Sequence, residues 1–100
     1  MKVFRHGEVL ITPVAVVPGG GKKKADAILA RGEATGHAHR VESREAVELW
    51  EFENELYFRL GSAGGTVVHE EHAAIRLEPG NYKVWKQRQY RPEGNARIQD

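Results

Sequence analysis

The sequence predicts an all-β fold, a small barrel or sandwich of about eight to nine short antiparallel strands. Its apolar residues recur with the spacing of strands, and no long stretch has the spacing of a helix. Turn-forming glycine, proline and asparagine residues interrupt the apolar runs about every ten residues. The length of 100 residues suits one domain that covers residues 1–100.

The first half of the chain is expected to form three strands and one exposed loop. Residues 8–17 are rich in valine and isoleucine, which favours a central strand. Pro13 indicates an edge or a bulge within this strand, because proline cannot donate to a ladder. Residues 18–24 combine three glycines with three lysines and predict a flexible, exposed loop. The next two strands are expected at residues 27–34 and 37–42.

The second half is expected to continue as antiparallel strands. Residues 47–52 and 56–60 predict a β-hairpin, because Asn54 between them tolerates left-handed backbone geometry. Pro79 and Gly80 occupy the positions that a type II turn favours, ahead of a long final strand. The remaining strands are expected at residues 66–68, 74–77 and 82–90.

Composition excludes several kinds of site. The chain has no cysteine, so it has no disulfide and no thiolate ligand, and a metal ion would be held by imidazole and oxygen. The net charge is +1, with basic ends and an acidic middle, which does not by itself define a basic face. No signal peptide or membrane-spanning stretch is apparent, so we expect a soluble, cytoplasmic protein without a membrane partner.

Four of the five histidines fall into two clusters, His37 with His39 and His69 with His72. Residues two apart on a strand face the same side about 6.5 to 7 Å apart, so His37 and His39 can bind one ion. Residues three apart face opposite sides of a regular strand, so His69 and His72 can cooperate only if the chain bends between them. His6 stands alone and is expected at the surface.

Convergence of the two clusters would form a site for a divalent metal ion. Imidazole and oxygen ligands suit Zn, Mn, Fe, Ni or Cu. Nearby carboxylates could act as ligands or general bases, and we take Glu70 and Glu71 as the candidate catalytic residues. Glu33 and Glu42 are further candidates for contact with the ion. An open coordination position would support a metal-dependent hydrolase or oxygenase.

Two other interpretations of the histidines stay open. The imidazoles could transfer protons or contact phosphate without a metal, because imidazole titrates near neutral pH. They could also be ordinary polar residues at strand ends, with no site between them. The sequence therefore does not decide whether the protein is an enzyme.

A second hypothesis is a nucleic-acid-binding or phosphate-binding module. Cations and aromatic side chains interleave along the last predicted strand, an arrangement that can stack bases and neutralise phosphates. These residues are Lys83, Trp85, Lys86, Arg88, Tyr90 and Arg91. The same cations are also typical of a solvated sheet edge, where they discourage aggregation.

A third hypothesis is a homo-oligomer. Small β domains often close their sheets by association, and histidine clusters can hold a metal across a symmetry axis. Trp50 and Phe52 are the candidate contact residues, because alternation places them on the strand face opposite Leu49.

Two resemblances add to these interpretations. The segments that carry the first are residues 32–39, 69–75, 77–84 and 87–90. They resemble a family of bacterial proteins of about this length and of uncharacterised function, which implies no activity. Residues 32–42 are also similar to the first cupin motif, in which a glycine precedes an HxH pair and a carboxylate follows on a small β-barrel. That resemblance implies His37, His39 and Glu42 as ligands of a divalent metal, and it provides no counterpart for His69 and His72.

Overall fold

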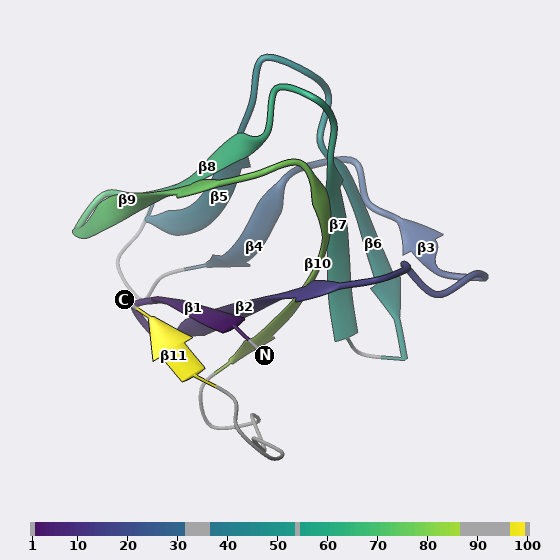
Figure 1. Cartoon of the computed structure of the whole chain (residues 1–100), viewed down its shortest axis with the longest axis horizontal. Helices are drawn as coiled ribbons and strands as arrows, with labels where there is room; N and C mark the ends of the chain where they lie inside the picture. Colours follow the sequence, from purple (N-terminus) through teal and green to yellow (C-terminus); the bar gives the residue numbers. More distant parts are fainter. Residues whose placement is uncertain (1, 32–36, 54, 87–96, 100) are drawn as a thin grey trace.

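The computed structural model describes residues 2–31, 37–53, 55–86 and 97–99. These residues form eleven β-strands arranged in two sheets (Figure 1). The prediction of an all-β fold is confirmed. Within the same ranges there is no helix long and apolar enough to cross a membrane.

The larger sheet has seven strands in the order β11-β1-β2-β10-β7-β6-β3. Its members are β1 (Lys2–His6), β2 (Val9–Val14), β3 (Lys22–Lys23), β6 (Glu48–Phe52), β7 (Glu55–Leu60), β10 (Gly80–Lys86) and β11 (Arg97–Gln99). Neighbours are antiparallel except for β11, which lies parallel to β1. The strand expected at residues 8–17 corresponds to β2. Its predicted central position is correct, because β2 pairs with β1 on one side and with β10 on the other.

The smaller sheet has four antiparallel strands in the order β4-β5-β8-β9. They are β4 (Ile28–Arg31), β5 (Ala38–Glu42), β8 (Gly65–His69) and β9 (His72–Leu77). Figure 1 shows this sheet lying across the larger one. Of the two predicted architectures the molecule therefore has the sandwich-like one, because the described strands form two separate sheets and do not close into a barrel.

The hydrophobic core lies between the two sheets and takes side chains from both. It is formed by Val9, Ile11, Leu29, Val41, Leu49, Phe58, Leu60, Val67, Leu77, Tyr82 and Val84. The alternation expected of half-buried strands is plain in β7 and β10, where Phe58 and Leu60, and Tyr82 and Val84, point to the core. The rings of Phe58 and Tyr82 stack there with centroids 5.0 Å apart.

All eight strands located in the sequence have counterparts in the structure, and three further strands were missed. Short length explains two of them: β11 has three residues, and β3 has two, which lie within the segment expected as a loop and pair with Glu51 and Trp50. The sequence did not predict β1, because its apolar residues Val3 and Phe4 are adjacent and do not alternate with polar ones. The expected left-handed residue of the β6–β7 turn, Asn54, lies outside the described residues, whereas Glu53 has a φ of 50°.

Two tight hairpins bring distant segments to one end of the sandwich. In the first, His6 pairs with Val9 across a turn that contains Gly7, whose φ of 64° favours glycine. In the second, His69 pairs with His72 across a turn made by Glu70 and Glu71. The ends of β1 and β9 come into contact, so the two turns lie close together.

Candidate metal centre

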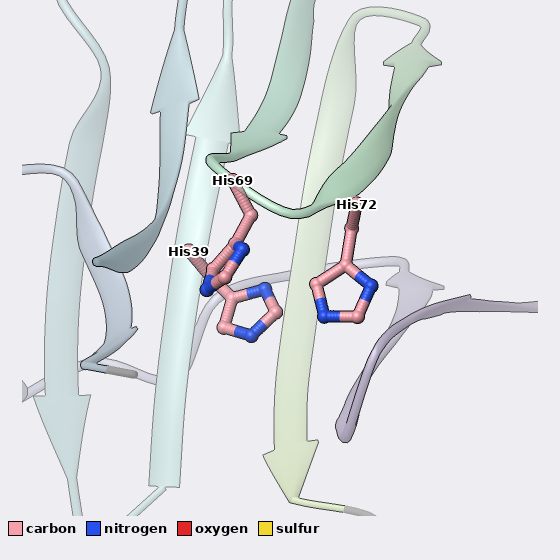
Figure 2. Close-up of side chains that lie close together, drawn as sticks. All are labelled: His39, His69 and His72. Atoms are coloured by element: carbon pink, nitrogen blue, oxygen red, sulfur yellow. The ribbon is translucent and has the colours of Figure 1, made fainter. Parts of the chain in front are cut away.

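Three histidines converge beside the β8–β9 turn. One ring nitrogen from each of His39, His69 and His72 lies within 4.8 Å of the others (Figure 2). The ring centroids of His39 and His69 are 4.4 Å apart, those of His69 and His72 are 4.7 Å apart, and those of His39 and His72 are 5.6 Å apart. The two histidine clusters of the sequence therefore meet in one place. We call these three residues the histidine triad.

The hairpin explains how His69 and His72 reach the same site. Residues directly opposite each other in an antiparallel pair project from the same face of the sheet. Because these two histidines are register partners across the turn, both side chains point toward the same space. The bend that the sequence required between them is thus a two-residue hairpin turn.

His37 and His39 both lie beside His69 but belong to different groups of possible ligands. His37 precedes β5, and its ring groups with His69 and Glu70, whereas His39 groups with His69 and His72. The Nδ1 atom of His37 is buried, has no hydrogen-bond partner among the described residues, and lies 3.8 Å from a carboxylate oxygen of Glu71. His37 therefore lies beside the histidine triad and is not a member of it.

Glu70 is held by neighbouring groups. One carboxylate oxygen accepts a hydrogen bond from the backbone N–H of Ala38 at 3.0 Å, and the other accepts one from the Arg40 guanidinium at 2.8 Å. These bonds, with that from Arg40 the larger cause, lower the pKa of Glu70 to about 2. A carboxylate with so low a pKa is a weak base near neutral pH. Because its two hydrogen bonds go to Ala38 and Arg40, Glu70 instead holds the β8–β9 turn against β5. The predicted catalytic roles of Glu70 and Glu71 stay predictions.

His6 is the site residue that the sequence interpretation missed. Expected at the surface, it is buried, with 2 % of its area exposed. Its Nε2–H donates to the carbonyl oxygen of Ala73 at 3.0 Å, and its Nδ1 lies 2.8 Å from Nδ1 of His39. The available signal was the pair Gly7-Glu8 ahead of the apolar run that begins at Val9. This pattern is typical of a hairpin turn, which would have placed His6 at a strand end.

The buried imidazoles are neutral near pH 7. Burial is the main cause that lowers the pKa of His39 to about 4, and the neighbouring rings of His69, His6 and His72 add to it. Burial also lowers the pKa of His6, against the opposing effect of its bond to Ala73. Neutral imidazole is the form that binds metal ions.

The hydrogen positions on His6 and His39 follow from their bonds. A carbonyl oxygen only accepts, so Nε2 of His6 carries the hydrogen, and Nδ1 of the neutral ring must be an acceptor. Nδ1 of His39 is then the donor in the bond between the two rings. Nε2 of His39 therefore carries a lone pair. His6 accepts the hydrogen bond from the other ring nitrogen and so fixes the orientation of His39, as the hydrogen-bond acceptors of metal-binding histidines do.

His69 has a different constraint. Its Nδ1 accepts a hydrogen bond from the backbone N–H of Glu71 at 3.0 Å, so the neutral ring carries its hydrogen on Nε2. Coordination through Nδ1 would displace that bond, and coordination through Nε2 would require the hydrogen to move to Nδ1. In either case the N–H of Glu71 loses its partner when His69 binds an ion.

The buried histidines predict a pH-dependent stability of the metal-free protein. The pKa of His39 is about 4 in the folded protein and 6.5 as its ordinary value, so the unfolded chain takes up the proton first as the pH falls. Its contribution is complete above pH 6.5 and is lost progressively down to pH 4. We expect the free energy of unfolding to fall by about 2 kcal/mol between pH 7.5 and 5.

Urea denaturation at these two pH values measures this effect, with His39→Gln as the control that loses most of it. The contribution of Glu70 to stability does not interfere with this measurement. Its pKa is lowered from 4.5 to about 2, so its contribution is lost only at a lower pH than that of His39. Equal free energies of unfolding at pH 7.5 and 5 would contradict the burial of a neutral His39.

Gly7, in the β1–β2 turn of the larger sheet, packs against the histidine triad. A Cβ atom at this position would lie 2.8 Å from Nε2 of His72 and 3.1 Å from Cε1 of His39. The backbone of the β1–β2 turn therefore lies directly against two rings of the histidine triad, at a distance that only glycine permits.

A cleft of about 320 Å³ opens beside this turn. It is lined by Arg5, His6, Gly7, His72, Ala73, Ala74 and Ile75. The cleft thus shares His72 with the histidine triad. Glu42, by contrast, lies at the other end of β5 and lines a separate cleft with Ser43, Arg44 and Arg76, and Glu33 lies outside the described residues.

The residues of the nucleic-acid hypothesis lie elsewhere. Lys83 forms an ion pair with Glu55 and sits over the ring of Trp85, 4.5 Å from its centroid. Trp85 is half-buried and Lys86 is exposed at the end of β10. Arg88, Tyr90 and Arg91 lie outside the described residues.

The residues of the oligomer hypothesis are partly covered. Trp50 and Phe52 are both half-buried, and the guanidinium of Arg59 lies 5.0 Å from the Trp50 ring centroid. The hypotheses of nucleic-acid binding and homo-oligomerisation stay predictions.

Comparison with known proteins places the chain in a family. Residues 5–87 match a family described as a domain of unknown function (DUF8820), and this range contains all five histidines. Searches of curated proteins and of solved structures found no match. No link to the cupins emerges, in keeping with sheets that do not close into a barrel. Because the match spans most of its length, the chain belongs to the DUF8820 family.

Proposed function

We propose that this protein binds one divalent metal ion through His39, His69 and His72 and leaves a coordination position open. The observation that carries the proposal is the approach of three ligand nitrogens to within 4.8 Å of one another. In a tetrahedral zinc site with Zn–N bonds of about 2.0 to 2.1 Å, the ligand nitrogens are about 3.4 Å apart. A contraction of at most about 1.4 Å between these nitrogens would therefore bring the three rings to bonding distance.

The chemistry of the cluster also favours an ion. Five imidazoles gather at one end of the sandwich, and His6 and His39 are buried there as neutral rings. The bond from His39 to His6 uses Nδ1 of His39, so the Nε2 lone pair of His39 is free to face a cation. A metal ion would satisfy this lone pair and those of the neighbouring rings.

The triad is a better candidate than the second group of His37, His69 and Glu70. Both oxygens of Glu70 already accept hydrogen bonds, one of them from a charged guanidinium. Recruiting this carboxylate would break the contacts that hold the β8–β9 turn to β5. We therefore assign the ion to the three imidazoles.

Three imidazoles with an open position support two kinds of reaction. With zinc, this donor set activates water for hydrolysis, because the metal lowers the pKa of bound water to about 7. With iron, imidazole-rich sites with open positions support reactions of oxygen. The identity of the bound metal separates a hydrolase from an oxygenase.

Elemental analysis of untagged protein purified without chelators tests the proposal. We expect about one zinc or iron ion per chain, either as isolated or after reconstitution and removal of excess metal. Protein that retains no metal after reconstitution with zinc, iron, manganese and nickel would overturn the proposed function.

Replacing His6 by leucine tests whether His6 orients His39 for metal binding. The variant removes the acceptor for His39 and leaves the Ala73 carbonyl unpaired, so the orientation of His39 is lost. We expect metal affinity to fall by about 10- to 100-fold, as is usual for residues that orient a metal ligand. Competition with a chromogenic chelator measures the affinity, and circular dichroism checks the fold. An unchanged affinity in a folded variant would contradict the assigned role.

A further inference from the structure

One polar atom beside the histidine triad is not accounted for by the proposed ion. Nδ1 of His37 is buried and has no hydrogen-bond partner among the described residues. Buried polar atoms are nearly always paired, so an unpaired one indicates a partner such as an ion or a bound water. A carboxylate oxygen of Glu71 lies 3.8 Å from this nitrogen, which is too far for a hydrogen bond between them.

The spacing of these two donors suits a second cation. In a tetrahedral zinc site with bonds of about 2.0 to 2.2 Å, neighbouring donor atoms are about 3.4 Å apart. Nδ1 of His37 and the oxygen of Glu71 would therefore approach by only about 0.4 Å to bind one ion. The Glu71 side chain is 69 % exposed, so this small movement does not disturb the core.

His69 provides a third donor. It belongs to the histidine triad and also to the group of His37, His69 and Glu70, whose donor atoms lie within 4.8 Å of one another. An imidazole ring has two nitrogens, so one ring can contact two ions. Nδ1 of His69 is the nitrogen on the side of Glu71, because it accepts a hydrogen bond from the backbone N–H of that residue. Nε2 is then left for the histidine triad.

We propose that a second divalent cation binds to Nδ1 of His37, the carboxylate of Glu71 and Nδ1 of His69, so that the His69 ring bridges two ions. This inference rests on the proposed function, because the ion of the histidine triad occupies the other nitrogen of His69. Glu70 keeps its hydrogen bonds to Ala38 and Arg40 and is not a ligand.

The bridge makes the second ion the weaker one. When it binds, the hydrogen that the His69 ring carries on Nδ1 leaves to solvent, and the ring becomes an anion between two cations. The two cations still repel each other, so we expect the second ion to bind at least about tenfold more weakly than the first. It is then removed with excess metal, and elemental analysis after reconstitution counts only the first ion.

Titration of metal-free protein with zinc, in competition with a chromogenic chelator, tests the inference. We expect two zinc ions per chain, bound in two steps whose affinities differ by at least about tenfold. His37→Ala and Glu71→Gln should each keep the first step and weaken the second at least tenfold. Glu51→Gln, which removes an exposed carboxylate from β6 of the larger sheet, is the matched control and should keep both steps.

Copper tests the bridge itself, because imidazole ligands also suit Cu(II). Two Cu(II) ions that share one deprotonated imidazole couple antiferromagnetically. The second equivalent of copper should therefore lower the electron paramagnetic resonance signal of the one-copper protein instead of doubling it. In His37→Ala the second equivalent should cause no such loss of signal.

The outcomes separate the two proposals. One zinc ion per chain at saturation, lost in His72→Ala and kept in His37→Ala, would overturn the second site and leave the proposed function intact. A second zinc ion that His37→Ala and Glu71→Gln bind at full affinity, or two copper signals that simply add, would also overturn the inference. Protein that takes up none of zinc, iron, manganese and nickel would overturn both proposals.

Discussion

Replacing His72 by alanine is expected to abolish stoichiometric metal binding while leaving the fold intact. His72 is exposed, and it pairs with His69 through the backbone of the β8–β9 hairpin, so loss of its ring removes a ligand without opening the core. Exposed substitutions of this kind usually change stability by less than about 0.5 kcal/mol. Loss of a direct ligand should exceed the roughly 10- to 100-fold loss typical of a residue behind a ligand.

Elemental analysis after reconstitution measures this loss, and a metal-dependent rise in melting temperature provides a second readout. His37→Ala is the matched control, because His37 belongs to the same sequence cluster as His39 but lies outside the histidine triad. We expect the control to retain its metal. Loss of metal from His37→Ala together with retention in His72→Ala would show that the ion is held by the other group.

The second large effect is expected from Gly7→Ala. The added Cβ would lie 2.8 Å from Nε2 of His72, and the φ of 64° is a conformation that costs a non-glycine residue about 1 to 2 kcal/mol. Relief of the contact must move either the turn or the ring of His72. We therefore expect a lower free energy of unfolding and, separately, metal affinity reduced by about tenfold or more.

Gly20→Ala distinguishes backbone strain from contact with the site. Gly20 has a φ of 83°, but its Cβ would meet only Phe52, at 3.9 Å. This control should lose stability to a similar degree and keep its metal affinity. Equal metal affinities in the Gly7 and Gly20 variants would contradict a role of Gly7 in shaping the site.

The arrangement of the site explains why these two substitutions differ. All three residues of the histidine triad lie on the smaller sheet, in β5, β8 and β9. His6 and Gly7 come from the larger sheet and close over the rings. The three proposed ligands thus lie on hydrogen-bonded strands, which position side chains more rigidly than loops do. Gly7 would influence the proposed metal site through its contact with the rings of His72 and His39, where one sheet packs on the other.

The sequence by itself determined the fold class and most of the strands. The alternation of Phe58 and Leu60 on β7 and of Tyr82 and Val84 on β10 is local, and the pleat of a strand alone makes it visible. The absence of cysteine likewise restricts a metal site to imidazole and oxygen ligands, whatever fold the chain adopts. The sequence also singled out four of the five clustered histidines by their spacing.

Only the tertiary structure decided which histidines act together. His6 joins His39 across 33 positions of sequence, and Glu70 joins Arg40 across 30, through pairings that no local pattern encodes. The hairpin register placed His69 opposite His72, and the packing of the rings put His39 with His69 and His72 but His37 with His69 and Glu70. Periodicity reports which face of a strand a residue occupies, whereas the partners of that face depend on how strands pair and sheets pack.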